Sequence, residues 1–154
     1  MNYIKKIILL IFLIFISGCG YKPILSTKDS NFAITNIKFV GDKSIATKIR
    51  NNFEIYKDTE NKSKFYDLEI LLNKEKKIIT KDSKGNPKIF EIFVSANVVV
   101  LENNEIKNKK TISKSFSYNN SSDKFSLKRY EKNIEDNLIE EIVSSIILHI
   151  YSIQ

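Results

Sequence analysis

A short apolar run near the N-terminus decides how much of this chain is left to form a folded domain. Lys5 and Lys6 precede an unbroken apolar stretch of ten residues, from Ile7 to Ile16. As a helix, that stretch covers about 15 Å, roughly half of the hydrocarbon core of a bilayer. A basic start, a short apolar core and small residues after it are typical of a secretory signal. We therefore expect residues 1–18 to be a signal peptide, which leaves residues 19–154 for one mature domain and its attachment.

The run ends at the single cysteine of the sequence, Cys19. One cysteine cannot form an internal disulfide, so in an exported chain it needs another explanation. Residues 16–19 (Ile-Ser-Gly-Cys) resemble the bacterial lipobox, which implies a diacylglycerol thioether on Cys19 and an N-acyl chain on its amine. Two or three such chains anchor a protein stably to a membrane. Gly20 replaces the aspartate that would resemble an inner-membrane retention signal, so we expect an outer-membrane lipoprotein. The alternative is an ordinary buried cysteine behind a signal peptide.

Four segments of the mature chain alternate or concentrate apolar residues in the manner of β-strands. They are residues 32–40, 66–79, 89–101 and 111–118, and residues 19–31 before them form a polar tether. The first strand changes phase after Ile34, which indicates a β-bulge. Turn residues at 84–87 and 103–104 separate the last three strands. Strands joined by such short turns are antiparallel neighbours.

Two further segments carry an apolar stripe at helical spacing. In the first, Ile45, Ile49, Phe53 and Tyr56 form the stripe, and Asp42 can cap the helix. In the second, with Ser122 or Asp123 as N-cap, the stripe is Leu127, Tyr130, Ile134, Leu138, Ile142, Ile146 and Ile150. The order strand, helix, three strands, helix predicts an α+β domain over residues 32–154. We expect a two-layer sandwich, with a four-stranded, mainly antiparallel sheet and both helices on one face.

The end of the second helix is apolar on more than one side. Beside Ile150 of the stripe, Val143, Ile147 and Tyr151 extend the apolar surface around the helix, although the stretch after Glu141 is too short to span a membrane. A helix that is apolar on most of its circumference is buried on more than one side. We therefore expect these four residues to face a partner protein, the alternative being that they complete the core of the domain itself.

Lysines gather around both predicted turns. The candidate contacts for an anionic glycolipid are Lys81, Lys84 and Lys88 near the first turn and Lys107, Lys109 and Lys110 near the second. Adjacent hairpins are expected to bring the two groups together as a cationic surface for phosphates. Solvated hairpin ends are one alternative. Compositional drift is another, because nearly all of the positive charge comes from lysine. A secretion signal argues against nucleic acid as the partner.

Few residues are available to build a catalytic or metal site. The glycines of the mature chain, Gly20, Gly41 and Gly85, are too far apart for a phosphate-binding loop. One histidine and a lipidated cysteine leave a zinc site dependent on carboxylates. His149 lies near Ser144, but within the apolar helix end and without a nucleophile elbow. We expect a protein that binds rather than catalyses, with no metal and no cofactor besides the acyl chains on its cysteine.

Two stretches of sequence resemble a known family. Residues 18–23 (Gly-Cys-Gly-Tyr-Lys-Pro) are similar to the start of the lipopolysaccharide-assembly lipoprotein family LptE, particularly its proteobacterial members. Residues 117–125 resemble that family's passage from last strand to last helix, and the order of elements agrees. The chain is richer in Lys, Ile and Asn than most members, and only Cys19 carries over as a specific residue.

The resemblance implies a location and a partner. It implies two helices on a four-stranded sheet, held at the outer membrane inside the β-barrel LptD, facing the periplasm or the barrel lumen. There the lipoprotein would assist assembly of the barrel and transport of lipopolysaccharide to the outer leaflet. Two other functions stay open: a lipid-anchored periplasmic carrier with a hollow for a hydrophobic or anionic ligand, and a structural lipoprotein. The latter would favour a long uniform helical repeat, which this sequence lacks.

Overall fold

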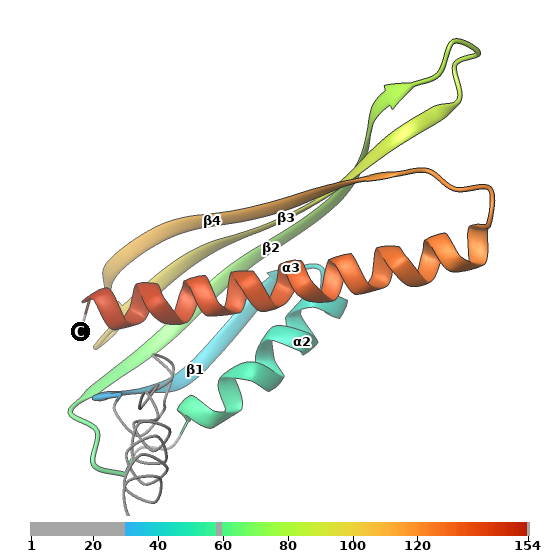
Figure 1. The fold of residues 1–154 in the computed structure, drawn as a ribbon. Helices are drawn as coiled ribbons and strands as arrows, with labels where there is room; N and C mark the ends of the chain where they lie inside the picture. Colours follow the sequence, from blue (N-terminus) through green and yellow to red (C-terminus); the bar gives the residue numbers. More distant parts are fainter. Residues whose placement is uncertain (1–29, 58–59, 154) are drawn as a thin grey trace, which may run out of the picture.

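A computed structural model describes residues 30–57 and 60–153 as one sheet with two helices beside it (Figure 1). The elements are β1 (Phe32–Gly41), α2 (Lys43–Phe53), the 3-10 helix η2 (Glu54–Tyr56), β2 (Lys64–Lys81), β3 (Pro87–Glu102), β4 (Glu105–Asn119) and α3 (Lys124–Ile153). The expected α+β sandwich is confirmed. The expected signal peptide and nearly all of the tether lie outside the described residues.

The strands are arranged in the order β1-β2-β3-β4. β1 and β2 are parallel, as the intervening helix α2 allows, while β2, β3 and β4 are antiparallel neighbours. The predicted bulge in β1 is confirmed, because the register shifts between Ile34 and Asn36. The Thr35 hydroxyl at this shift lies 2.7 Å from Oδ1 of Asp67 on β2.

Each turn has the local chemistry that its sequence indicated. In the β2–β3 turn, Asp82 Oδ1 accepts hydrogen bonds from the backbone N–H groups of Lys84 and Asn86, at 2.9 and 2.8 Å. In the β3–β4 turn, Asn103 and Asn104 have φ values of 55° and 66°. Positive φ at both residues is typical of the tight turns that join antiparallel strands.

The core lies between the sheet and the helices. The α2 side chains Ile45, Ile49 and Phe53 are buried, as their spacing predicted, and the Asp42 carboxylate accepts hydrogen bonds from the first turn. Asp123, one of the two predicted caps, does the same for α3, from Phe125 and Ser126. None of the helices in the described ranges combines the length and apolarity needed to cross a bilayer.

Two expectations about α3 are corrected by the packing. Val143, Ile147 and Ile150 are buried in the core cluster that also contains the α2 side chains, so they are not available to a partner as the domain stands. The helix is indeed covered on more than one side, but by its own chain. Tyr151 is half-buried, and its ring lies 5.1 Å from that of Phe32 on β1. Tyr130, expected in the buried stripe, is 47% exposed because it lies toward the edge strand β4.

The β2–β3 hairpin projects beyond the rest of the domain (Figure 1). The last residue of β4, Asn119, pairs with Ile89, so the pairs nearer the turn have no third strand beside them. Ile78 and Ile79 are half exposed at the base of this arm, which we define as residues 78–88. The arm lies at the same end of the sheet as the start of α3.

Candidate functional site

The two groups of candidate lysines lie at opposite ends of the sheet. Lys81, Lys84 and Lys88 are on the arm, whereas Lys107, Lys109 and Lys110 follow the β3–β4 turn. β3 belongs to both hairpins, so its whole length separates the two turns. Lys110 pairs with Val98, ten residues from Lys88 on β3, or about 33 Å along an extended strand. The expectation that the two hairpins form one cationic surface is therefore wrong.

The six lysines also differ in their contacts. The Lys107 ammonium pairs with Glu102 and lies 5.5 Å from the centre of the Tyr66 ring, so it is held by its own domain. Hydrogen bonding to Glu102 raises the pKa of Lys107. The ammonium groups of the other five lysines make no ion pair with any residue in the described ranges. Cys19 lies outside those ranges.

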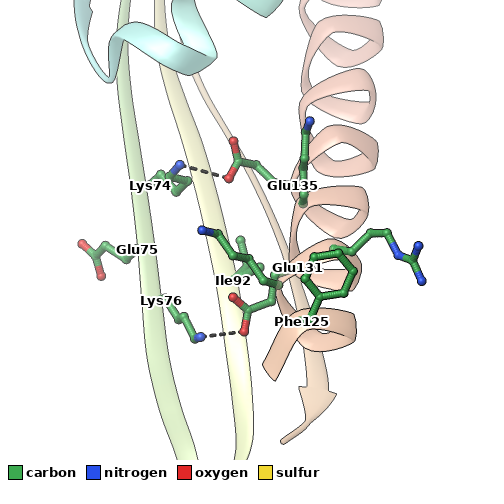
Figure 2. A pocket seen from close by; sticks show the side chains of 10 residues that line it. Lys74, Glu75, Lys76, Ile92, Phe125, Glu131 and Glu135 are labelled. Atoms are coloured by element: carbon green, nitrogen blue, oxygen red, sulfur yellow. Dashed lines mark hydrogen bonds and ion pairs between the residues drawn. The ribbon is translucent and has the colours of Figure 1, made fainter. Parts of the chain in front are cut away.

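A groove of about 710 Å³ lies near the arm, between β2 and the first turns of α3 (Figure 2). β2 contributes Lys74, Glu75 and Lys76 to its lining, and β3 contributes Ile92. α3 contributes the side chains Phe125, Lys128, Arg129, Glu131, Lys132 and Glu135. The groove exists because α3 continues along the sheet past α2.

Two ion pairs cross from β2 to α3 inside this groove, and both are drawn in Figure 2. Lys74 Nζ lies 3.0 Å from Glu135 Oε2, and Lys76 Nζ lies 2.6 Å from Glu131 Oε1. The Tyr118 hydroxyl also donates to Glu131, at 2.7 Å. Burial opposes ionisation of Glu131, but the hydrogen bonds from Lys76 and Tyr118 outweigh it, so the pKa of Glu131 is lowered. The charges of Lys74 and Lys76 are thus neutralised by carboxylates of α3.

The rim of the groove keeps its positive charge. Lys128, Arg129 and Lys132 on α3 are exposed and have no ion pair within the described part of the chain. Phe125 is 77% exposed beside them, with its ring 5.9 Å from the Arg129 guanidinium carbon. An apolar ring beside several cations suits a molecule that carries both phosphate and hydrocarbon. Sequence reasoning missed these residues, although Lys124, Lys128 and Lys132 recur every fourth position and indicate one helix face.

His149 is buried in α3, 7% exposed, and its Nε2 has no hydrogen-bond partner in the described structure. The neighbouring Ser145 hydroxyl donates to the carbonyl of Glu141 on the same helix, at 2.8 Å. Within the described ranges, no three residues of the His, Cys, Asp and Glu types are grouped to hold a metal ion.

Burial of His149 has a consequence for stability against pH. Burial and the nearby positive charge of Lys110 lower the pKa of His149 from its ordinary 6.5. The unfolded chain then binds a proton more readily than the folded one, so stability is present above pH 6.5 and is lost as the pH falls toward the folded pKa. We expect His149→Leu to raise the free energy of unfolding by about 1–2 kcal/mol at neutral pH, since it removes a buried unpaired nitrogen. Urea unfolding between pH 7.5 and 5.5 measures both effects.

His149→Gln is the matched control for that experiment, because it keeps a polar side chain but cannot titrate. It should lose the acid-dependent part of the instability and gain little at neutral pH. An unchanged pH dependence in both variants would show that His149 is not the titrating group.

Comparison with known proteins gives the fold a context. No protein-family model and no curated protein matches the sequence. Rare lipoprotein B from Shewanella oneidensis matches with a TM-score of 0.59 at 10% identity, over 76% of this chain and 94% of that one. A minor lipoprotein from Acinetobacter baumannii matches with a TM-score of 0.60 at 11% identity, over 78% and 90%. Lipoprotein B from Nitrosomonas europaea gives 0.54 at 12%, over 84% and 88%. The chain therefore has the fold of these three lipoproteins.

Proposed function

We propose that this chain is an acylated outer-membrane lipoprotein that assists assembly of an LptD barrel, plugs it, and takes part in lipopolysaccharide transport to the outer leaflet. The observation that carries the proposal is the fold, which covers 94% of rare lipoprotein B from Shewanella oneidensis. The motif that ends at Cys19 supports the lipid anchor independently, because it is a pattern of residue types in the sequence and does not depend on the fold.

The proposed lipid contact lies at the arm end of the sheet. The arm lysines and the rim of the groove are both there, and together they bring unpaired cations beside an exposed aromatic ring. Lipopolysaccharide combines phosphate groups with acyl chains, so both parts have a counterpart at this end. Lys109 and Lys110 are too far away to contribute to the same contact. The role is one of binding, with no catalytic step.

A carrier that holds a hydrophobic or anionic ligand by itself is the second candidate. Two features of the groove favour a carrier: its volume of about 710 Å³ and the exposed ring of Phe125 at its edge. Most of the lining residues are charged, however, so much of the apolar surface comes from the hydrocarbon stems of their side chains. The interior of the domain is filled by the side chains of the core cluster.

Purification of the tagged full chain from its native membrane separates the two candidates. A barrel-associated lipoprotein should copurify with a large outer-membrane β-barrel, which mass spectrometry identifies as LptD or as another protein. Recovery of the chain with an apolar small molecule and without a barrel would favour the carrier and contradict the barrel proposal.

The position of the lipid contact is tested with two charge-reversal variants of the purified chain. Lys128→Glu/Lys132→Glu should weaken lipopolysaccharide binding about tenfold at low salt, where surface charges are least screened. Lys109→Glu/Lys110→Glu changes the net charge equally at the other end and should change binding by less than about twofold. Equal effects of the two variants would show that net charge, and not the groove, governs binding.

A further inference from the structure

β4 leaves one long side of the sheet open. Among the described residues it pairs with β3 alone, as the last strand in the order β1-β2-β3-β4. Its pairing with β3 is unbroken from Asn108 to Asn119. The strand contains neither proline nor glycine. The N–H and C=O groups on the far side of such a strand are a template for one more strand.

A groove runs between this open strand and α3. Two adjoining hollows of about 380 and 520 Å³ share the α3 side chains Asn137 and Glu141. At one end the lining includes Phe116 of β4 and Tyr130 of α3, which are 46% and 47% exposed. At the other end the lining is polar and includes Lys114. A strand added to β4 would therefore have room for side chains between itself and α3, apolar at one end and polar at the other.

The positive charge along β4 limits which kind of segment can pair with it as a further strand. Lys114 is paired with Glu141 at 3.1 Å and Lys107 with Glu102, whereas Lys109 and Lys110 have no ion pair with the described residues. A second copy of the chain would bring the same net positive charge to this edge, and lysines on edge strands oppose self-association.

The N-terminal segment of this chain is also a poor occupant. Residues 19–29 contain Lys22 and Lys28 against one acid, Asp29, so their charge has the same sign as that of β4. The described chain then enters β1, the opposite edge of the sheet. An acidic segment from another protein has the charge that β4 lacks.

We propose that β4 binds an extended acidic segment of a partner protein as a fifth strand, with apolar side chains of that segment in the groove beside α3. Phe116 follows Lys110 by six residues, or about 20 Å of strand. The segment therefore carries its apolar residues about six positions from its acidic ones. This interaction depends only on the fold and on β4, and is independent of any barrel.

Two blocked octapeptides labelled with fluorescein test this with the purified full chain in detergent. One has aspartate at positions 1 and 2, threonine at 3–6 and valine at 7 and 8; the other has the reverse order, for the other strand direction. At least one should bind in fluorescence anisotropy, and alternate amides of β4 should become protected from hydrogen exchange. Failure of both to bind up to about 1 mM, or protection confined to other elements, overturns the proposal.

Charge exchange identifies the binding surface. Lys109→Glu/Lys110→Glu should weaken binding about tenfold, while the matched variant Lys81→Glu/Lys84→Glu on the arm should change it less than about twofold. A peptide with lysine in place of aspartate should bind the Lys109→Glu/Lys110→Glu variant better than the unaltered chain. Equal losses in both variants, or a chain that dimerises through β4 by sedimentation and excludes the peptide, would refute the acidic partner.

Discussion

Gly41→Ala is expected to remove about 4 kcal/mol or more of folding free energy, a large part of the total for a domain of this size. Gly41 ends β1 with φ at 104°, a conformation that side chains with a Cβ rarely adopt. A Cβ at this position would lie 2.0 Å from the carbonyl oxygen of Leu72, the residue that pairs with it on β2. Backbone cannot give way as the end of a flexible side chain can, so the end of the β1–β2 pairing must open. Urea unfolding followed by circular dichroism measures the loss.

Gly85→Ala is the matched control for this variant. Gly85 also has positive φ, at 84°, but a Cβ there would meet nothing within 4 Å. We expect a loss of about 1 kcal/mol, the conformational part alone. The difference between the two variants isolates the contact with β2. Similar losses for both would mean that β1 does not approach β2 at Gly41 as the structure shows.

Cys19→Ser is expected to abolish acylation and to move the protein out of the outer-membrane fraction. In the proposed lipoprotein, the Cys19 thiol forms the thioether with a diacylglycerol, and a serine hydroxyl cannot form that bond. Without acyl chains the stable anchor is lost. The signal peptide is then expected to stay uncleaved, so that the chain keeps the apolar run from Ile7 to Ile16. Intact mass and separation of inner from outer membranes measure the two effects.

Ser17→Ala is the control for that substitution, because it keeps a small residue before the cysteine. It should be cleaved and acylated like the natural sequence. If the unaltered protein from its native host has a free thiol and retains residues 1–18, the lipoprotein proposal is excluded, whatever the fold.

Much of the fold follows from patterns within single elements. The alternation from Tyr66 to Leu72 places one face of β2 in the core, and the spacing of Ile45, Ile49 and Phe53 does the same for α2. The first part of β4 was not predicted, since the strand begins at Glu105 and not at Thr111. Between them Ile106 is the single apolar residue. This part is a strand because the tight turn pairs its backbone with β3. Backbone pairing does not require apolar and polar residues to alternate, so the sequence shows no strand pattern here.

The candidate site was predictable in part. Two consecutive hairpins share their middle strand, so the separation of the lysine groups follows from topology alone. The recurrence of Lys124, Lys128 and Lys132 was also visible in the sequence. The groove itself was not, because it depends on how far α3 continues past α2. Likewise, the sequence shows that the end of α3 is apolar all round, but not that its own chain covers Val143 and Ile147.

The length of β2 sets how far apart the two ends of the protein are. Its 18 residues extend about 59 Å, roughly twice the hydrocarbon thickness of a bilayer. Ser30, where the described chain begins, lies at the start of this span, since Phe32 pairs with Lys64, and the arm lies at its far end. An attachment of the chain near Ser30 therefore holds the arm at a fixed distance from the point of attachment. Deleting matched pairs of residues from β2 and β3 would shorten that distance in steps of about 7 Å.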